Sequence, residues 1–273
     1  MEGETLHWME VRLLVPETDT LELEALEQKI LATENRDQRI MLYCRLAELH
    51  EEWLDDVQGA IDAYQRVIDL APDHLEALRA VGRLQEKRGR YAEAVKATEM
   101  EVQATADRKA RVPAMLRMAW LQEHHLGDDQ AAVSSLERLL TYQGGVTPAL
   151  RSLQRLYERL GRHGDLIFAL RRELETMRSL EDGVPLLRRM AKAAHPLQND
   201  VEAAIRTWKE VLERAPRDLE ALDELASLYA LKQDRDAQAQ TLLRAAATFP
   251  PGRDRHGRLL QAAGLYEGPL KRP

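Results

Sequence analysis

The sequence contains a single cysteine, Cys44, so no disulfide forms within the chain and a cysteine-based metal cage is excluded. Aromatic residues make up only 5% and glycine is sparse, which argues against a β-sandwich or barrel with frequent turns. No apolar run approaches the ~18 residues that a membrane helix needs. Residues 1–30 carry acids throughout and lack the apolar region of a signal peptide. We therefore expect a cytoplasmic protein, and the excess of Arg over Lys indicates a bacterial source.

Motifs for catalysis are also missing. There is no phosphate-binding glycine loop, no dinucleotide fingerprint and no nucleophile elbow. His124 and His125 are adjacent, so on a helix they point about 100° apart and make a poor joint metal site. Paired acids such as Asp55-Asp56 stand where helix N-termini are expected, and there they complement the helix dipole. The sequence predicts no catalytic residue, no metal ligand and no cofactor, so we do not expect an enzyme.

Charge is unevenly distributed along the chain. Residues 1–74 contain 18 acidic and 6 basic residues, a net charge of −12, whereas the whole chain carries −7. The remaining residues therefore carry +5. This asymmetry describes the electrostatic field at the surface and says nothing about the fold.

The chain repeats itself without gaps, because positions whose numbers differ by 72 form columns of one character. Polar and small columns are Asp56, Asp128 and Asp200, then Ala60, Ala132 and Ala204, then Ala77, Ala149 and Ala221. A large apolar column is Leu84, Leu156 and Leu228. The step from one member of a column to the next is called one period below. Internal repeats of this kind indicate a stack of similar supersecondary units.

Each period divides into two helical hairpins. A dipeptide that begins with a large apolar residue marks the middle of each first helix. These dipeptides are Leu46-Ala47, Val81-Gly82, Met118-Ala119, Leu153-Gln154, Met190-Ala191 and Leu225-Ala226. Successive dipeptides are 35, 37, 35, 37 and 35 residues apart. This pattern resembles the tetratricopeptide repeat, a helix-turn-helix of ~34 residues with small residues where the helices cross. The second hairpin matches best, with Leu78, Val81-Gly82, Gly89, Tyr91 and Ala94 in the family's order.

The resemblance implies an all-α fold, a right-handed superhelix (a solenoid) of antiparallel helix pairs with about fourteen helices. It covers six hairpins over residues 38–250, preceded by a partial or capping hairpin at 1–37 and followed by another at 251–273. Within 1–37, residues 20–34 fit a second helix and residues 5–15 a first one. The ends are either degenerate caps or the edges of a longer solenoid.

Local signals predict where individual helices begin. Pro113, Pro148 and Pro185 each fall in a first helical turn, where a missing N–H costs nothing. Thr147 is a candidate N-cap for the helix of Pro148, and Asp128 and Asp200 are candidate caps of second helices. The aromatic residues Trp8, Trp53, Trp208 and Tyr64 are predicted to pack in the core or between hairpins.

Basic residues form stripes on the predicted first helices. Arg79, Arg83 and Lys87 are spaced i, i+4, i+8, and Arg151, Arg155 and Arg159 occupy the same columns one period later. Arg188 and Lys192 repeat the spacing on the next first helix, and the intervening helix 112–126 offers Trp120 and His124. In the tetratricopeptide family, first helices line the concave groove. The resemblance therefore implies a basic groove with one aromatic anchor over residues 74–196.

Two interpretations of these stripes stand side by side. Arginine forks pair well with carboxylates and Trp is a frequent hot-spot residue, so the groove fits an acidic partner peptide with one apolar anchor. Charges at i, i+4 are also what an ordinary solvated helix face looks like. Some family members clamp a C-terminal carboxylate with Lys, Arg and Asn on these helices. This chain has the cations without the asparagines.

The function expected from the sequence is a protein–protein interaction scaffold or adaptor, with the partner and the oligomeric state left open. One alternative is an RNA-binding helical repeat, but the sequence pI near 5.7 and the lack of an aromatic stacking platform argue against it. A second alternative is a regulatory subunit that positions a catalytic partner. A third is self-assembly through the chain ends.

Overall fold

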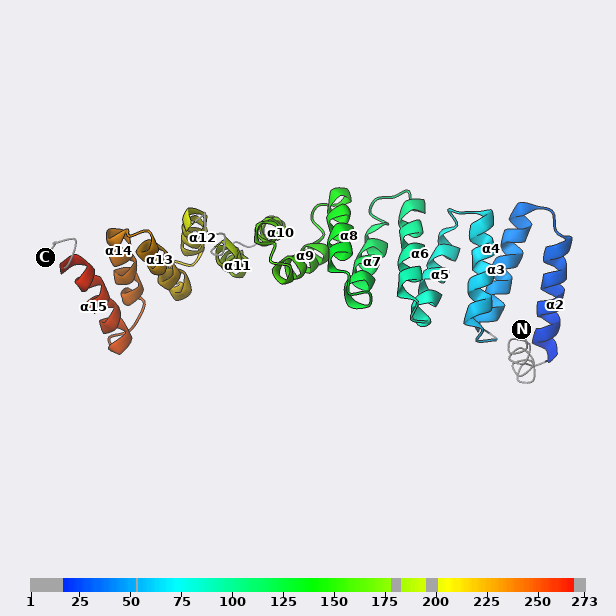
Figure 1. The fold of residues 1–273 in the computed structure, drawn as a ribbon, viewed down its shortest axis with the longest axis horizontal. Helices are drawn as coiled ribbons and strands as arrows, with labels where there is room; N and C mark the ends of the chain where they lie inside the picture. The colour runs from blue at the N-terminus through cyan, green and yellow to red at the C-terminus, as the bar shows by residue number, and fades with distance from the viewer. Residues whose placement is uncertain (1–16, 53, 178–182, 195–200, 268–273) are drawn as a thin grey trace. The chain divides into compact units, whose positions relative to one another are not determined.

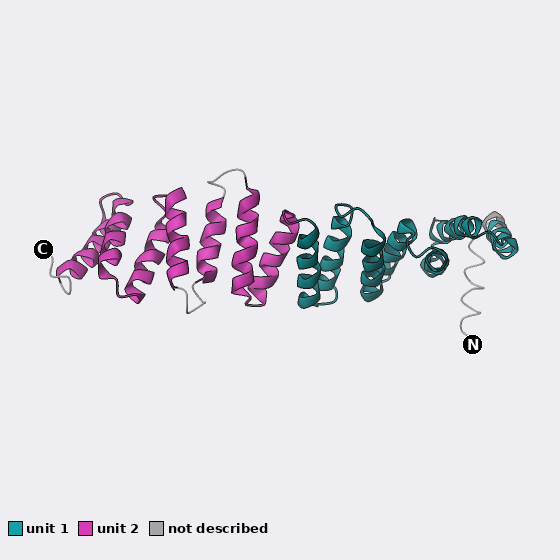
Figure 2. Cartoon of the chain, turned by 90° about the horizontal axis from the view of Figure 1, so that it is seen from above, with its two compact units in different colours: residues 1–143 teal, residues 144–273 magenta. Residues whose placement is uncertain are grey.

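The computed structural model describes residues 17–52, 54–177, 183–194 and 201–267, and the side chains from residue 22 onward. The predictions for a helix at 5–15, for Trp8 and Trp53, and for the Asp200 cap lie outside these ranges. The chain divides into two compact units, residues 1–143 and 144–273, coloured separately in Figure 2. Each unit is described by itself.

Every regular element in the described part of the chain is an α-helix. Unit 1 contains α2 (Glu17–Ala32), α3 (Arg36–Glu52), α4 (Val57–Leu70), α5 (Leu75–Lys87), α6 (Tyr91–Ala104), α7 (Val112–His124) and α8 (Asp129–Tyr142). Unit 2 contains α9 (Thr147–Arg159), α10 (His163–Thr176), α11 (Val184–Ala194), α12 (Val201–Arg214), α13 (Leu219–Leu231), α14 (Arg235–Ala247) and α15 (Arg253–Glu267). The predicted all-α fold is confirmed.

Within each unit, every helix packs chiefly on its neighbours in the chain, as Figure 1 shows for the successive helices. The pairs α3/α4, α5/α6 and α7/α8 are the three hairpins of unit 1, and α9/α10, α11/α12 and α13/α14 are those of unit 2. This nearest-neighbour packing is what a helical-hairpin solenoid requires, because one hairpin cannot bury its own apolar stripe. Helix α2 precedes the first hairpin and packs on α3, and α15 packs against α14.

The repeated columns are the core of both units. The alanines at helix crossings, Ala77, Ala149 and Ala221, have no exposed surface, and neither do Leu78, Leu150 and Leu222 beside them. Small side chains at these positions let the helix backbones approach each other. Trp208 and Tyr64 are buried, as predicted.

Helix starts follow the predicted chemistry with one exception. Asp56 and Asp128 accept hydrogen bonds from the backbone N–H groups of Gly59 (3.0 Å) and Ala131 (2.8 Å), so both are N-caps. Pro113, Pro148 and Pro185 are the second residues of α7, α9 and α11, in agreement with the prediction. The prediction that Thr147 is the N-cap of α9 is wrong. The N-cap of α9 is Val146 and makes no side-chain bond, because Thr147 already belongs to the helix.

Tight turns between the two helices of a hairpin use left-handed backbone conformations. Gly89 (φ +69°) and Gly161 (φ +66°) lie one period apart in this conformation, which costs glycine nothing. Gln233, one period further on, has φ +58° despite its side chain. The turn geometry is therefore kept even where the residue that favours it is lost.

Candidate functional site

The predicted site residues are divided between the two units: those on α5 and α7 belong to unit 1, and those on α9 and α11 to unit 2. On α5, Arg79, Arg83 and Lys87 all lie on the exposed face of the helix. Their spacing of four residues brings them onto one side of α5, because residues at i and i+4 are neighbours on a helix surface.

Two of the three cations on α5 are paired with acids of the preceding hairpin. Arg83 makes a two-pronged contact with Glu51 of α3, in which its second guanidinium nitrogen lies 2.8 Å from the carboxylate. Lys87 donates to Asp55 at 3.1 Å. The hydrogen bonds from Arg83 hold the pKa of Glu51 below its ordinary value, so Glu51 stays ionised. An acidic ligand would have to displace these internal carboxylates.

Arg79 is held differently. Its Nε donates at 2.7 Å to Oε1 of Glu101, a carboxylate on α6 whose side chain is only 8% exposed, while Arg79 itself is 53% exposed. The two terminal nitrogens of the guanidinium make no hydrogen bond with any described residue. A buried carboxylate thus fixes the orientation of an exposed guanidinium and leaves its outer nitrogens for a ligand.

The same arrangement recurs one period later, in unit 2. The Nε of Arg151, on α9, donates at 2.7 Å to Oε1 of Glu173 on α10. The Glu173 side chain is 3% exposed and that of Arg151 is 67% exposed. Gln154 donates to the other carboxylate oxygen at 2.6 Å. Arg79 and Arg151 are called the oriented arginines below.

The remaining predicted cations of unit 2 also have partners. Arg155 and Arg159 on α9 both take part in interactions. On α11, Arg188 donates to Asp218 through Nε at 2.9 Å, and Asp218 is at the same time the N-cap of α13. Lys192 lies 2.5 Å from Glu220 of α13. These pairs connect successive first helices, which is an ordinary stabilising role.

An aromatic cluster lies at the end of α7. Trp120 is 48% exposed and stacks on His124, with ring centroids 5.1 Å apart. His125 meets the edge of Trp120 at 4.9 Å and stacks on Tyr91 of α6 at 3.8 Å. The α7 helix is connected to α5 by an ion pair between Arg117 Nε and Glu86 at 2.7 Å. Trp120 and His124 are thus part of a stacked, half-exposed aromatic group on a helix that is connected to α5.

Sequence reasoning found the arginines and missed the groups that orient them. Glu101 and Glu173 occupy second-helix positions where a buried residue is expected, and they lie one period apart. A charged residue recurring in an otherwise apolar position was the available signal. A buried charge is kept only when it is paired, so this recurrence pointed to a partner on the facing helix.

Other chemistry has little support in the described residues. They contain no group of three or more His, Cys, Asp or Glu that could hold a metal ion. The half-buried Cys44 is free, and burial together with Glu76 and Glu48 raises the pKa of its thiol, so it is a poor nucleophile. No helix in the described ranges is both long enough and apolar enough to cross a membrane.

The geometry defines a class of protein: a helical-hairpin repeat with polar and aromatic groups displayed on its first helices. Comparison with known proteins names the repeat. The family model described as "Tetratricopeptide repeat" matches residues 44–74 and 113–145. The resemblance seen in the sequence is confirmed: these two stretches match the tetratricopeptide repeat, and the fold is a helical-hairpin repeat. No curated protein sequence gives a significant match.

Several solved structures match this chain at low sequence identity. A chain of the structure "Naa15/Naa10 bound to HypK-THB" is 15% identical with a TM-score of 0.55, and the match covers 90% of this chain and 37% of that one. A tetratricopeptide repeat protein from Parabacteroides merdae is 16% identical with a TM-score of 0.42, covering 84% and 89%. MamA is 18% identical with a TM-score of 0.37, covering 77% and 91%. At such identities the likeness concerns the fold alone.

Proposed function

We propose that this protein is a scaffold or adaptor that binds acidic segments of a partner protein, each of its two units acting through its own oriented arginine. The observation that carries the proposal is the pair of exposed guanidinium groups at Arg79 and Arg151, each held by a buried glutamate. A tetratricopeptide fold supports a protein-interaction role in general. The finer statement, an acidic ligand at these two arginines, is the proposal.

Pre-orientation favours the oriented arginines over the other cations. A free arginine loses rotamer entropy when it binds, whereas the guanidinium of Arg79 is already held by Glu101. Its outer nitrogens have the fork geometry that matches a carboxylate. Arg83 and Lys87 already have carboxylate partners, so they contribute mainly to the stability of the hairpin stack.

Trp120 supplies the apolar part of the proposed site in unit 1. It is half exposed, its ring is held by His124 and His125, and α7 adjoins α5 through the Arg117–Glu86 pair. Held aromatic rings bind with a small entropy loss, which is why they are common hot spots. A ligand with an apolar residue near its acids fits this combination. In keeping with the sequence, we propose a cytoplasmic bacterial protein without catalytic activity of its own.

The test is a binding titration with three fluorescein-labelled 12-residue peptides that carry one Leu among Glu and Asp, among Gln and Asn, or among Lys. The acidic peptide should bind most tightly, and its affinity should fall with added salt. The variant Arg79→Gln/Arg151→Gln should weaken binding at least about tenfold, the effect of losing charge-assisted hydrogen bonds.

The control variant is Arg66→Gln/Arg217→Gln, which removes the same charge from one exposed arginine of each unit, Arg66 on second helix α4 and Arg217 before α13. It should bind like the wild type. Equal weakening by both variants would reduce the effect to net charge and overturn the proposal. A single-stranded RNA that binds more tightly than the acidic peptide, with a steeper salt dependence, would favour the RNA-binding alternative instead.

A further inference from the structure

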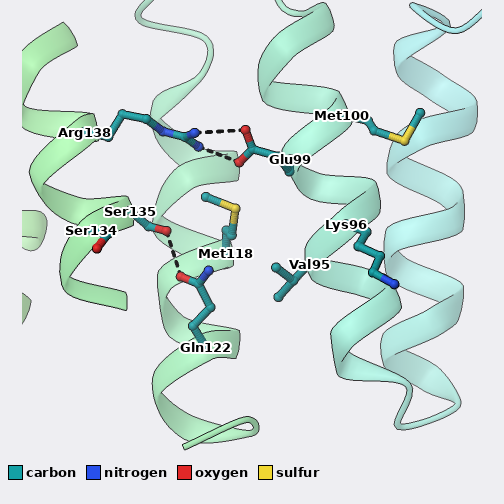
Figure 3. Close-up of a pocket in the computed structure, with 9 residues that line it drawn as sticks. All are labelled: Val95, Lys96, Glu99, Met100, Met118, Gln122, Ser134, Ser135 and Arg138. Carbon is teal, nitrogen blue, oxygen red and sulfur yellow. Dashed lines mark hydrogen bonds and ion pairs between the residues drawn. The ribbon is translucent and has the colours of Figure 1, made fainter. Parts of the chain in front are cut away.

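A hollow lies between the second helices α6 and α8, with α7 as its floor, on side chains other than those of the proposed acidic-peptide site. Its volume is about 550 Å³. In Figure 3, Met118 and Gln122 of α7 and Val95 of α6 project into the space, and the Glu99–Arg138 pair closes one end. Met100 and Lys96 stand on the outer edge of α6.

Most polar groups of this hollow have partners within the protein; the exceptions are the Lys96 ammonium and the buried Nε of Arg138. Arg138 makes two hydrogen bonds to Glu99, at 2.9 and 2.5 Å. Ser135 donates to Gln122 at 2.8 Å, and Ser134 donates to a backbone carbonyl. Lys96 is exposed and makes no hydrogen bond or ion pair with any described residue. The lining therefore offers a ligand apolar surface and one unpaired cation.

The apolar surface is made largely of methionine. Met100 is 39% exposed and separates this hollow from a second one of about 300 Å³, lined by Pro72, Asp73, Gln103 and Ala104. Methionine is flexible and polarizable, so it adapts to the shape of an inserted side chain. Two shallow hollows on either side of one methionine suit an extended stretch of a macromolecule better than a small molecule.

The next period carries a different pair of residues at the positions of Lys96 and Met100. Phe168 and Arg172 of α10 stand one period after Lys96 and Met100. The guanidinium of Arg172 lies over the Phe168 ring, 5.6 Å from its centroid. In unit 2 the Phe168 ring is 62% exposed and has the Arg172 guanidinium of the same helix beside it. In unit 1, Met100 is 39% exposed, and Lys96 near it has no partner among the described residues.

We infer that the hollow between α6 and α8 is a second docking surface, whose occupant is a partner-protein segment with a large aliphatic side chain next to an acidic residue. The aliphatic side chain enters the hollow against Met118 and Met100, and the carboxylate pairs with Lys96. Charge complementarity selects this occupant, because Lys96 is the one lining charge that the described part of the chain leaves uncompensated.

The probe is a phage-displayed library of random 12-residue peptides. Phage are selected for binding to the full chain, and those that also bind the Met100→Arg variant are removed. This variant carries at position 100 the arginine that stands one period later, at position 172. Enriched sequences should place Leu, Ile, Met or Phe next to Asp or Glu. As synthetic peptides they should bind Met100→Arg at least about tenfold more weakly than the wild type, because the substitution fills the apolar site with a charge.

A charge exchange sharpens the test. Lys96→Glu should lower the affinity for the acidic peptides about fivefold, and this variant should bind more tightly the peptides in which Lys replaces the acid. Two controls, Arg172→Met and Arg66→Gln, should leave binding unchanged, and circular dichroism should show that all four variants stay helical. The inference is overturned if no such sequences are enriched, if they bind Met100→Arg equally well, or if Lys96→Glu keeps the acidic preference.

Discussion

Unit 1 and unit 2 share their apolar columns, but at equivalent positions they exchange the charges that connect their second helices. In unit 1, Glu99 of α6 pairs with Arg138 of α8. One period later the glutamate is replaced by Arg171 and the arginine by Glu210, which lie 3.9 Å apart in unit 2. Packing requires a particular volume at each core position, whereas an ion pair requires only opposite signs.

A second comparison concerns the position of Gly82 and Gln154. A Cβ at Gly82 would lie 2.5 Å from the Nη2 of Arg117, so the missing side chain makes room for that arginine beside Thr98. In unit 2, Gln154 fills the space and accepts a hydrogen bond from Arg189 at 2.8 Å. The ion pairs Arg117–Glu86 and Arg189–Glu158 occupy equivalent positions in the two units. A glycine in unit 1 and a glutamine in unit 2 therefore accommodate the same interhelical ion pair.

The largest expected effect tests whether the repeated core columns are energetically equivalent. Leu78→Ala and Leu150→Ala both remove a side chain with no exposed surface, and each should cost about 2–5 kcal/mol of stability. In a nearest-neighbour solenoid the damage is local. Hydrogen exchange should therefore rise around α5 and α6 for Leu78→Ala, and around α9 and α10 for Leu150→Ala. A uniform rise over all helices would contradict this account.

The next largest effect on stability compares the two buried glutamates, Glu173 and Glu101. Glu173→Ala removes the acceptor of both the Arg151 Nε and the buried Gln154 Nε2, and it should cost about 2–3 kcal/mol. Glu101→Ala affects Arg79 alone and should cost about 1 kcal/mol. Urea unfolding measures both. Adding Gln154→Leu to Glu173→Ala should recover part of the loss, and equal costs for the two single variants would break the comparison.

A smaller effect tests the exchanged charges. Glu99→Arg places two cations together and should cost about 1 kcal/mol, since the pair is partly exposed. Glu99→Arg/Arg138→Glu copies the arrangement of unit 2 and should return to within about 0.5 kcal/mol of the wild type. Thermal unfolding gives the comparison. If the double variant loses as much stability as Glu99→Arg and Arg138→Glu lose together, the charges at the two positions are not interchangeable.

The same pair predicts a pH dependence. Hydrogen bonds from Arg138 hold the pKa of Glu99 below its ordinary value. A carboxylate with a lowered folded-state pKa contributes stability that is present above its unfolded pKa, about 4.3 for Glu, and lost as pH falls through the folded value. The stability difference between wild type and Glu99→Gln should therefore be constant near neutrality and shrink below about pH 4. A difference that grows on acidification would contradict the pairing.

The smallest effect concerns the tight turns. Gln233→Gly should stabilise the protein by about 0.5–1 kcal/mol, because glycine takes the left-handed conformation without strain. The reverse change, Gly161→Gln, should destabilise it by a similar amount. Calorimetry of the two variants checks both directions, and a lower melting temperature for Gln233→Gly would sink the explanation.

The sequence predicted the fold because hydrophobic periodicity and small-residue columns depend on backbone spacing alone. Ala77 and Leu78 could be assigned to the core from the repeated columns, and the alternation of first and second helices follows from the same spacing. Thr147 shows the limit: two adjacent residues competed for one cap position, and the helix began one residue earlier than the pattern indicated.

The candidate site was predictable only in part. The spacing of Arg79, Arg83 and Lys87 gave the exposed stripe, since i, i+4 spacing fixes a helix face. It could not distinguish Arg83, which is paired with Glu51 of the preceding hairpin, from Arg79, which is held by Glu101 of its own. Those pairings depend on how helices distant in sequence meet. The hollow at Met100 and Met118 was missed for the same reason.

The central claim is that a buried glutamate creates a binding group by orienting Arg79. The direct measurement is the affinity of the acidic peptide for Glu101→Met beside Glu93→Met, where Glu93 is an exposed acid on the same helix. Both variants remove one negative charge, so net charge alone predicts equal or tighter binding. The account predicts that Glu101→Met binds several-fold more weakly than the wild type and that Glu93→Met does not. If Glu101→Met binds as tightly as Glu93→Met, the orientation of Arg79 by Glu101 plays no part in binding.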